Sequence, residues 1–157
     1  MYLRIVVDIR EHKEVKERVQ ITVGIDKIEY PGEVTTRTVD TNTVKIHISS
    51  TISTPNARFV NLDIGNFYLE TPMEQKEYAR IRVDDIPMQF MDEFDLWDLV
   101  VDGYVYIEIG KGMYGLPQAG ILANELLRKQ LQPFGFYECK HTPGLWRHVT
   151  HNISFTL

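Results

Sequence analysis

The chain has 157 residues, a length that fits one ordinary domain. Hydrophobic residues make up 43% of it and charged residues 25%, a composition that excludes a disordered chain. The formal net charge of −5 offers no argument for nucleic-acid binding, and the single cysteine, Cys139, excludes an intramolecular disulfide framework. Because no apolar run is long enough to span a membrane, we expect a soluble intracellular protein with both helices and strands.

The N-terminal third contains one clear strand pattern and one ambiguous segment. Residues 19–25 alternate aliphatic side chains with polar ones or glycine, which predicts a half-buried strand. Residues 27–30 are its predicted short partner, because a Pro-Gly turn follows them. In residues 40–51, alternating β-branched residues favour a strand, whereas apolar residues spaced by four and an aspartate suited to capping, Asp40, favour a helix. The segment is ambiguous, but local propensity favours the strand.

The middle of the chain is predicted to supply strands on both sides of a helix. Residues 59–64 form an apolar run that contains Asp63, and we expect a buried strand that carries this carboxylate near its end. Two further strands are expected, over residues 81–83 and 104–109. The second of these should continue into a β-hairpin through a Gly-Lys-Gly segment. A proline in the first turn and clustered apolar residues predict a helix over residues 87–99.

The C-terminal part begins with the clearest helix pattern, residues 117–132. Pro117 suits the first turn, leucines line one face, and Pro133 stops the helix. Three short strands are expected after it, over residues 136–139, 145–148 and 153–157. Because the last of these is apolar and has no polar cap, we expect that the chain is truncated.

Three groups of titratable side chains are candidates for chemistry. Asp63 would be costly to bury among apolar neighbours unless it is paired or bound to a cation, although a carboxylate that caps a turn is the simpler explanation. The adjacent Asp84 and Asp85 are expected in a solvated turn. Cys139 and His141 suggest a small zinc-binding module, but the spacing of the cysteine and the nearby histidines is too close for the usual zinc geometry.

Two segments in a fixed order resemble a known family. Residues 61–73, NLDIGNFYLETPM, resemble the first carboxylate motif of the reverse transcriptases of copia-type LTR retrotransposons. Residues 111–119, KGMYGLPQA, resemble the second motif of that family, a Tyr-Gly-Leu-x-Gln-Ala segment. Residues 134–136 and 142–146 resemble its Gly-Phe and Asp-Pro-x-Leu-Phe elements, so that the similarity covers roughly residues 18–157.

The resemblance implies an α+β fold, namely the fingers and palm of a right-hand polymerase, truncated before the third catalytic motif. The whole chain, residues 1–157, would be a fragment of a single reverse-transcriptase domain. The fingers would comprise approximately residues 1–56, and the palm residues 57–157, with an inserted fingers segment at about 84–116. The family also favours a helix over the ambiguous segment, residues 40–51.

The activity implied by the resemblance is that of an RNA-directed DNA polymerase, a nucleotidyltransferase that adds deoxynucleotides to a primer 3′-hydroxyl. Copying uses two Mg²⁺ (or Mn²⁺) ions, which prefer hard oxygen ligands on rigid elements. Asp63 matches the first metal carboxylate of the family, and the backbone carbonyl of Ile64 would be a second ligand. We expect the ions to bind weakly to this chain, because only one of three catalytic aspartates is present in it.

Four further residues match positions that bind the incoming nucleotide in the family. Tyr68 matches the ring that lies under the sugar and excludes a ribose 2′-hydroxyl, and Gln118 matches a residue that touches the nucleotide. Arg18 matches a residue that grips the triphosphate, since a guanidinium binds phosphate bidentately. Gln20 stands where the family usually has a second basic residue.

The hairpin with two adjacent aspartates that forms the third motif of the family would begin just past Leu157. We therefore expect the isolated chain to be inactive. A full-length parent would bind an RNA or DNA template-primer and a deoxynucleoside triphosphate, and no membrane. Family members act in cytoplasmic particles and their products reach the nucleus, but no targeting signal is recognised in this sequence. An unpaired palm edge would favour self-association. The alternative is a non-catalytic αβ scaffold or interaction module that has decayed from a retroelement.

Overall fold

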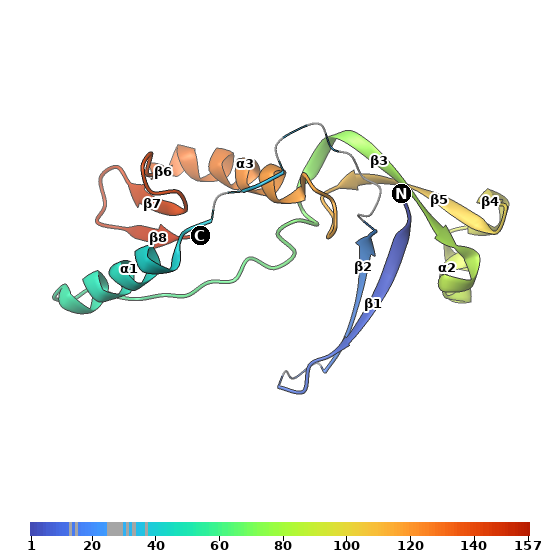
Figure 1. Cartoon of the computed structure of the whole chain (residues 1–157), viewed down its shortest axis with the longest axis horizontal. Helices are drawn as coiled ribbons and strands as arrows, with labels where there is room; N and C mark the ends of the chain where they lie inside the picture. Colours follow the sequence, from blue (N-terminus) through green and yellow to red (C-terminus); the bar gives the residue numbers. More distant parts are fainter. Residues whose placement is uncertain (13, 15, 25–29, 31, 33, 37) are drawn as a thin grey trace. The chain divides into compact units, whose positions relative to one another are not determined.

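The computed structural model describes residues 1–12, 14, 16–24, 30, 32, 34–36 and 38–157. The chain has a mixed α+β structure, which confirms the predicted class at that level (Figure 1). It forms two compact units, the first built from Met1–Val34 and Asn66–Leu122 and the second from Thr35–Gly65 and Ala123–Leu157. None of the helices among the described residues is long and apolar enough to cross a membrane. The division into fingers and palm stays a prediction.

The first unit begins with a two-stranded antiparallel ribbon of β1 (Leu3–Ile9) and β2 (Glu17–Val23). The strand expected from the alternation in residues 19–25 is confirmed as far as Val23, and Ile25 lies outside the described residues. Of the expected partner, residues 27–30, the structure describes only Tyr30, which belongs to no strand. The partner that the structure shows is β1, whose Leu3 and Val7 lie opposite Val23 and Val19.

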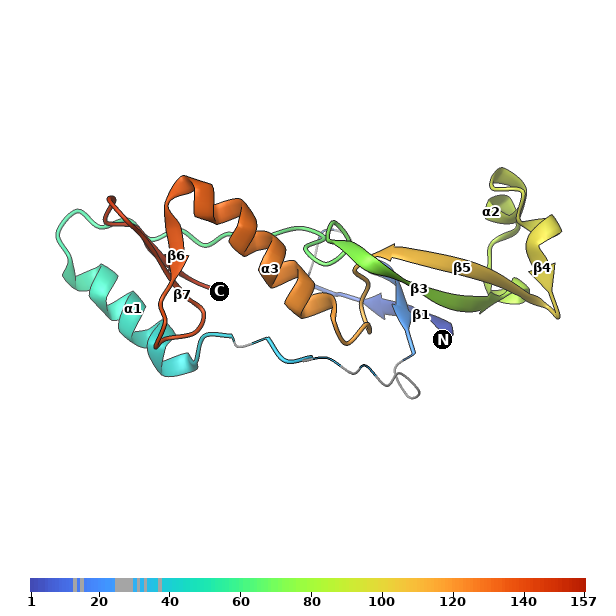
Figure 2. The same cartoon turned by 90° about the horizontal axis from the view of Figure 1, so that it is seen from above.

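A three-stranded sheet forms the rest of the β-structure of this unit, in the order β3 (Pro72–Arg82), β5 (Tyr104–Lys111), β4 (Val100–Val101). β3 and β5 are antiparallel neighbours (Figure 2). Their register is irregular between Pro72 and Glu77. The strand expected over residues 81–83 is therefore the end of a much longer one. Short 3-10 turns lie at Val83–Asp85 and Leu96–Leu99, and the first of them contains the exposed Asp84 and Asp85.

Two expectations for this region are wrong. β5 does not turn back in a hairpin after Gly110, because the hydrogen bonds of the following segment go elsewhere: Gly112 donates to the Thr71 carbonyl, and the Tyr114 carbonyl accepts from Val23. The helix expected over residues 87–99 is limited to α2 (Met88–Glu93), since Asp95 adopts a left-handed backbone conformation with φ of 50°.

The buried side chains of the first unit form two clusters. The first comprises Val23, Met73, Ala79, Ile109, Leu116 and Ala119. The second comprises Ile81, Met91 and Val105. Each cluster includes side chains from both β3 and β5, because alternate residues of a strand point to the same face.

The second unit contains α1 (Thr41–Ser53) and a small antiparallel sheet of β6 (Phe136–Glu138), β7 (Leu145–His148) and β8 (Ser154–Thr156). These three strands confirm the strand predictions for the C-terminal part. α3 (Ala119–Leu131) begins in the first unit, and a 3-10 turn at Gln132–Phe134 follows it. The helix predicted over residues 117–132 is thus confirmed over most of its length.

α1 settles the ambiguous segment in favour of a helix. Asp40 caps its N-terminus, where its side chain accepts hydrogen bonds from the backbone N–H groups of Asn42 and Thr43. Those two N–H groups have no partner within a helix, so the cap compensates for the weak helix propensity of the β-branched residues that follow.

Candidate active site

The first unit brings residues 66–73 of the first motif-like segment into direct contact with the second segment, residues 111–119. Gly112 donates its backbone N–H to the carbonyl of Thr71 over 2.7 Å, and Thr71 is only 1% exposed. A Cβ atom on Gly112 would lie 2.6 Å from the carbonyl oxygen of Tyr68. Only glycine allows the two backbones to approach this closely. The segment that follows Asp63 in the chain is therefore held against the segment that leads to Gln118.

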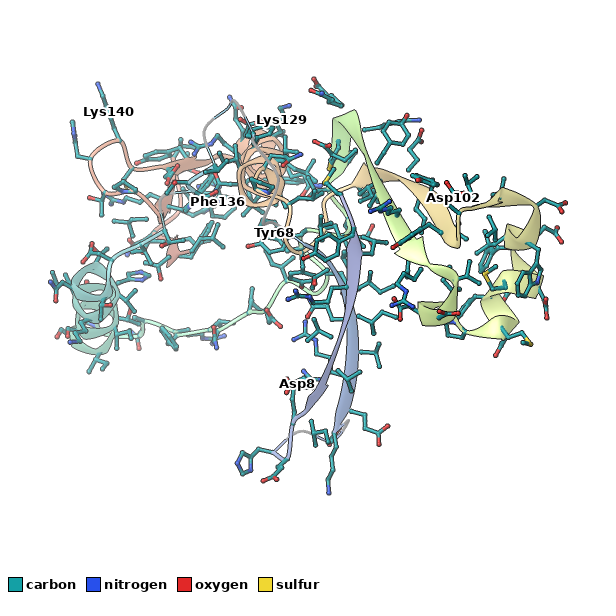
Figure 3. The ribbon with its side chains drawn as sticks, turned by 45° about the vertical axis from the view of Figure 1, so that its right-hand side comes forward. Asp8, Tyr68, Asp102, Lys129, Phe136 and Lys140 are labelled. Carbon is teal, nitrogen blue, oxygen red and sulfur yellow. The ribbon has the colours of Figure 1, made fainter. Side chains whose placement is uncertain are left out.

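Tyr68 packs edge-on against Tyr114, with ring centroids 5.4 Å apart and an interplanar angle of 86°. This T-shaped geometry is a favourable arrangement of two aromatic rings. Tyr68 is half-buried and also packs against the first core cluster. In Figure 3 Tyr68 lies beside the end of the β1–β2 ribbon at which β1 begins and β2 ends, whereas Asp8 lies toward the opposite end. The core thus fixes the position of this ring while leaving part of it accessible.

Gln118 lies immediately before α3 and is only 5% exposed. Its side-chain nitrogen, Nε2, donates a hydrogen bond to Glu77 Oε1 over 3.0 Å. Its side-chain oxygen, Oε1, is buried and accepts no hydrogen bond in the part of the chain that the structure describes. An unsatisfied buried acceptor costs about 1–3 kcal/mol, a cost that a ligand with a hydroxyl or N–H group would remove.

Glu77 is the residue of this site that the sequence did not point out. It lies on β3 opposite Ile109, on the same face of the sheet as the buried Ala79 and Ile81. A carboxylate at an inward position of a strand is an informative signal. The signal was hidden because residues 72–80 were not expected to be part of a strand.

The β1–β2 ribbon is joined to the same region. Val23 donates its N–H to the Tyr114 carbonyl over 2.9 Å, and a Cβ atom on Gly115 would lie 2.3 Å from the Val23 carbonyl oxygen. Gln20 and Arg18 lie further out on β2, roughly 10 and 16 Å from Val23 along the strand. Both are half-buried and face the same side of the ribbon, two residues apart. The predicted triphosphate-binding pair is therefore on an element that contacts the Tyr114 turn.

Asp63 and Ile64 belong to the second unit, in a segment without helix or strand. Both residues are exposed, and Leu62 before them is 85% exposed. The expectation of a buried strand over residues 59–64 is wrong, because no described segment pairs with the backbone of this run. Asp63 and Ile64 offer a carboxylate and a carbonyl, two of the hard oxygen donors that Mg²⁺ prefers. Their juxtaposition with Tyr68 and Gln118 stays a prediction.

Among the residues that the structure describes, no three His, Cys, Asp or Glu side chains are close enough together to hold a metal ion. Comparisons with models of known protein families, with curated proteins and with solved structures find no match to the chain. The contacts between Tyr68, Thr71, Gly112, Tyr114 and Gln118 and their neighbours are thus the structural basis for a functional hypothesis.

Proposed function

We propose that this chain is the fingers and palm part of an RNA-directed DNA polymerase of the copia-type retrotransposon class. The observation that carries the proposal is the contact between the two motif-like segments, in which the Thr71 carbonyl accepts from Gly112 at 2.7 Å. The segments are 41 residues apart at this contact, and the resemblance requires them to build one site. The helix α1 gives further support, because the family favours a helix over residues 40–51.

In this proposal the deoxynucleoside triphosphate is bound by residues of the first unit. Gln118 would accept a hydrogen bond from the nucleotide with its unpaired Oε1, while Glu77 holds the amide in place. Tyr68, braced by Tyr114, would contact the sugar and disfavour a ribose 2′-hydroxyl. Arg18 and Gln20 would contact the triphosphate from β2.

Mg²⁺, when bound by Asp63 and the Ile64 carbonyl together with ligands from elsewhere, would supply Lewis-acid activation of the primer hydroxyl and neutralise the leaving group. The proposal assigns this chain one of the three catalytic carboxylates of the family. We therefore expect the isolated chain to bind the nucleotide without extending a primer, and the template-primer would be held by the full-length parent.

Nucleotide binding to the whole chain tests the proposal directly. Calorimetric titration in the presence of Mg²⁺ should give saturable binding of a deoxynucleoside triphosphate that is tighter than that of the matching ribonucleotide. Replacement of Gln118 by Ala should weaken deoxynucleotide binding between about twofold and tenfold, the value of one hydrogen bond. Tyr68→Ala should reduce the discrimination between the two sugars, and Tyr68→Phe should preserve it.

Matched variants make this test specific. Gln130→Ala changes the same residue type at an exposed position of α3, the helix that begins directly after Gln118, and should leave binding unchanged. Circular dichroism of each variant separates lost binding from lost folding. Absence of saturable deoxynucleotide binding, or equal effects of Gln118→Ala and Gln130→Ala, would contradict the proposal and favour the non-catalytic scaffold. A Mg²⁺-dependent product in a primer-extension assay would contradict the expected inactivity of the isolated chain.

A further inference from the structure

The β3–β5 sheet has one face in the core and one open face. Ala79, Ile81 and Val105 point inward and are almost fully buried. The register places Tyr78 opposite Glu108, Arg80 opposite Tyr106, and Arg82 opposite Tyr104. Because side chains alternate along a strand, these six residues share the face that points away from the core. The open face therefore has a defined and unusual composition, three tyrosines and two arginines among six positions.

Two of the three tyrosines of this face, Tyr78 and Tyr106, present their rings to solvent. Tyr78, on the edge strand β3, is 60% exposed, and Tyr106, on the neighbouring β5, is 54% exposed. The Arg80 guanidinium lies over the Tyr104 ring, 4.4 Å from its centroid, in a cation–π contact. This contact holds the guanidinium on the sheet surface next to the exposed Tyr106, and its N–H donors remain available at the edge of the group.

The open face is locally positive although the protein carries a net charge of −5. Among its six residues, Arg80 and Arg82 are positive and Glu108 is negative, and the ion-pair partners Lys76 and Asp84 add one charge of each sign. No carboxylate among the described residues lies within ion-pair distance of Arg80. Two ion pairs lie on or next to this face, Lys76 with Glu108 at 2.6 Å and Arg82 with Asp84 at 3.0 Å. Because both are solvent-exposed, they contribute little to stability, and each cation can exchange its carboxylate for a phosphate.

Tyr78 and Lys76 both contact Glu108 at one end of the face. Tyr78 donates its hydroxyl to Glu108 Oε2 over 3.1 Å, and Lys76 pairs with Oε1 of the same carboxylate. The hydrogen bond with Lys76 lowers the pKa of Glu108, and it raises the pKa of Lys76. The Tyr78 ring is thereby fixed at its hydroxyl end while its faces stay exposed.

We infer that this open face binds single-stranded nucleic acid, with bases stacked on Tyr78 and Tyr106 and phosphates bound by Arg80 and Arg82. Aromatic rings and arginines that share a flat sheet surface are the arrangement that recognises unpaired bases and a phosphate backbone together. A duplex hides its base faces, so it would not use the tyrosine rings. The inference rests on the proposed polymerase function, whose parent would bind a template-primer, and it extends that function by naming contact residues on a face to which the resemblance assigns no role.

Fluorescence anisotropy with labelled oligothymidylate and labelled oligouridylate tests the inference on the whole chain. Both oligonucleotides offer bases for stacking and phosphates for the arginines. The one that binds more tightly identifies the preferred strand as DNA or RNA. Replacing Tyr78 or Tyr106 by Ala should weaken binding between about fivefold and 150-fold, because stacking of one base has this value. Tyr78→Phe keeps the ring and should retain binding. Arg80→Gln should reduce the slope of log affinity against log salt by about one.

The second unit offers a matched control. Tyr137 on β6 lies opposite Arg147 on β7, and both residues are exposed. Tyr137→Ala and Arg147→Gln should leave the anisotropy titration unchanged. The inference is overturned if the wild-type chain binds neither oligonucleotide, if a blunt duplex binds as tightly as a single strand, or if Tyr137→Ala weakens binding as much as Tyr106→Ala. These outcomes are independent of nucleoside triphosphate binding at Gln118.

Discussion

Gln118 and Glu77 form a hydrogen-bonded pair between the start of α3 and the inward face of β3, with 3.0 Å between Nε2 and Oε1. The pair fastens the helix to the sheet at a point where the neighbouring side chains are apolar. It also fixes the orientation of the Gln118 amide, so that its buried oxygen has a defined position. One side of the amide therefore makes a structural bond, while the oxygen on the other side has no hydrogen-bond partner among the described residues.

Replacement of Glu77 by Ala should destabilise the first unit. The change leaves the buried amide nitrogen of Gln118 without an acceptor, which costs about 1–3 kcal/mol. Urea denaturation followed by circular dichroism measures the loss. Glu74→Ala, at an exposed position of the same strand, should change the stability by less than about 0.5 kcal/mol. Equal effects of the two variants would show that the Gln118–Glu77 bond contributes nothing.

Gly112→Ala should be destabilising, because its Cβ atom would lie 2.6 Å from a backbone oxygen that cannot move aside cheaply. Overpacking of this kind costs about 1–3 kcal/mol. Gly110, two residues earlier, has nothing within 4 Å of the corresponding position, so Gly110→Ala should be neutral or slightly stabilising. A difference between the two midpoints of urea denaturation is expected, and identical midpoints would contradict the close contact with Tyr68.

Periodicity predicted the elements whose stabilising contacts are mostly local or between near neighbours in sequence. The helix α3 and the strands β6, β7 and β8 follow from leucine spacing, from alternation and from the prolines and glycines between them. For the segment that forms α1, local propensity favoured a strand, because its β-branched side chains are typical of one, and this preference is wrong. The cap by Asp40 stabilises the helix. In the sequence, an aspartate at this position is compatible both with a helix cap and with the alternative strand, so it could not separate the two.

The elements that were missed depend on partners far away in the sequence. β3 lacks the alternation of a typical strand because residues 74–77 are all polar, including Glu77 at an inward position, and the strand is held by pairing with β5. Conversely, residues 59–64 have a strand-like composition but no described partner, and a strand requires one to satisfy its backbone. For the candidate site, the resemblance indicated Tyr68 and Gln118, whereas Glu77 became recognisable only when the register of β3 was known.

Trp146 should be the most sensitive position of the second unit. It is 1% exposed and stacks on Phe155 with ring centroids 5.7 Å apart, and the Arg128 guanidinium lies 5.5 Å from its ring centroid. Replacement by Ala would leave a large cavity and should cost about 3–5 kcal/mol. Trp97, the other tryptophan, is 49% exposed, so acrylamide should quench it more strongly than Trp146. Efficient quenching of the Trp97→Phe variant would contradict the buried position of Trp146.

The stability of α1 should depend on acid through Asp40. Hydrogen bonds from the side chain and the backbone of Thr43 lower the pKa of Asp40 below the ordinary value of 3.8. A carboxyl whose pKa is lowered by folding contributes stability above its unfolded pKa, and this contribution is lost as the pH falls through the lower, folded value. The denaturation midpoint of the wild type should therefore fall more steeply below about pH 4 than that of Asp40→Asn, which keeps a capping oxygen but does not titrate. Asp98→Asn, which removes an exposed carboxylate in the first unit, serves as the control. Parallel acid profiles of the wild type and Asp40→Asn would contradict the role of the charged cap.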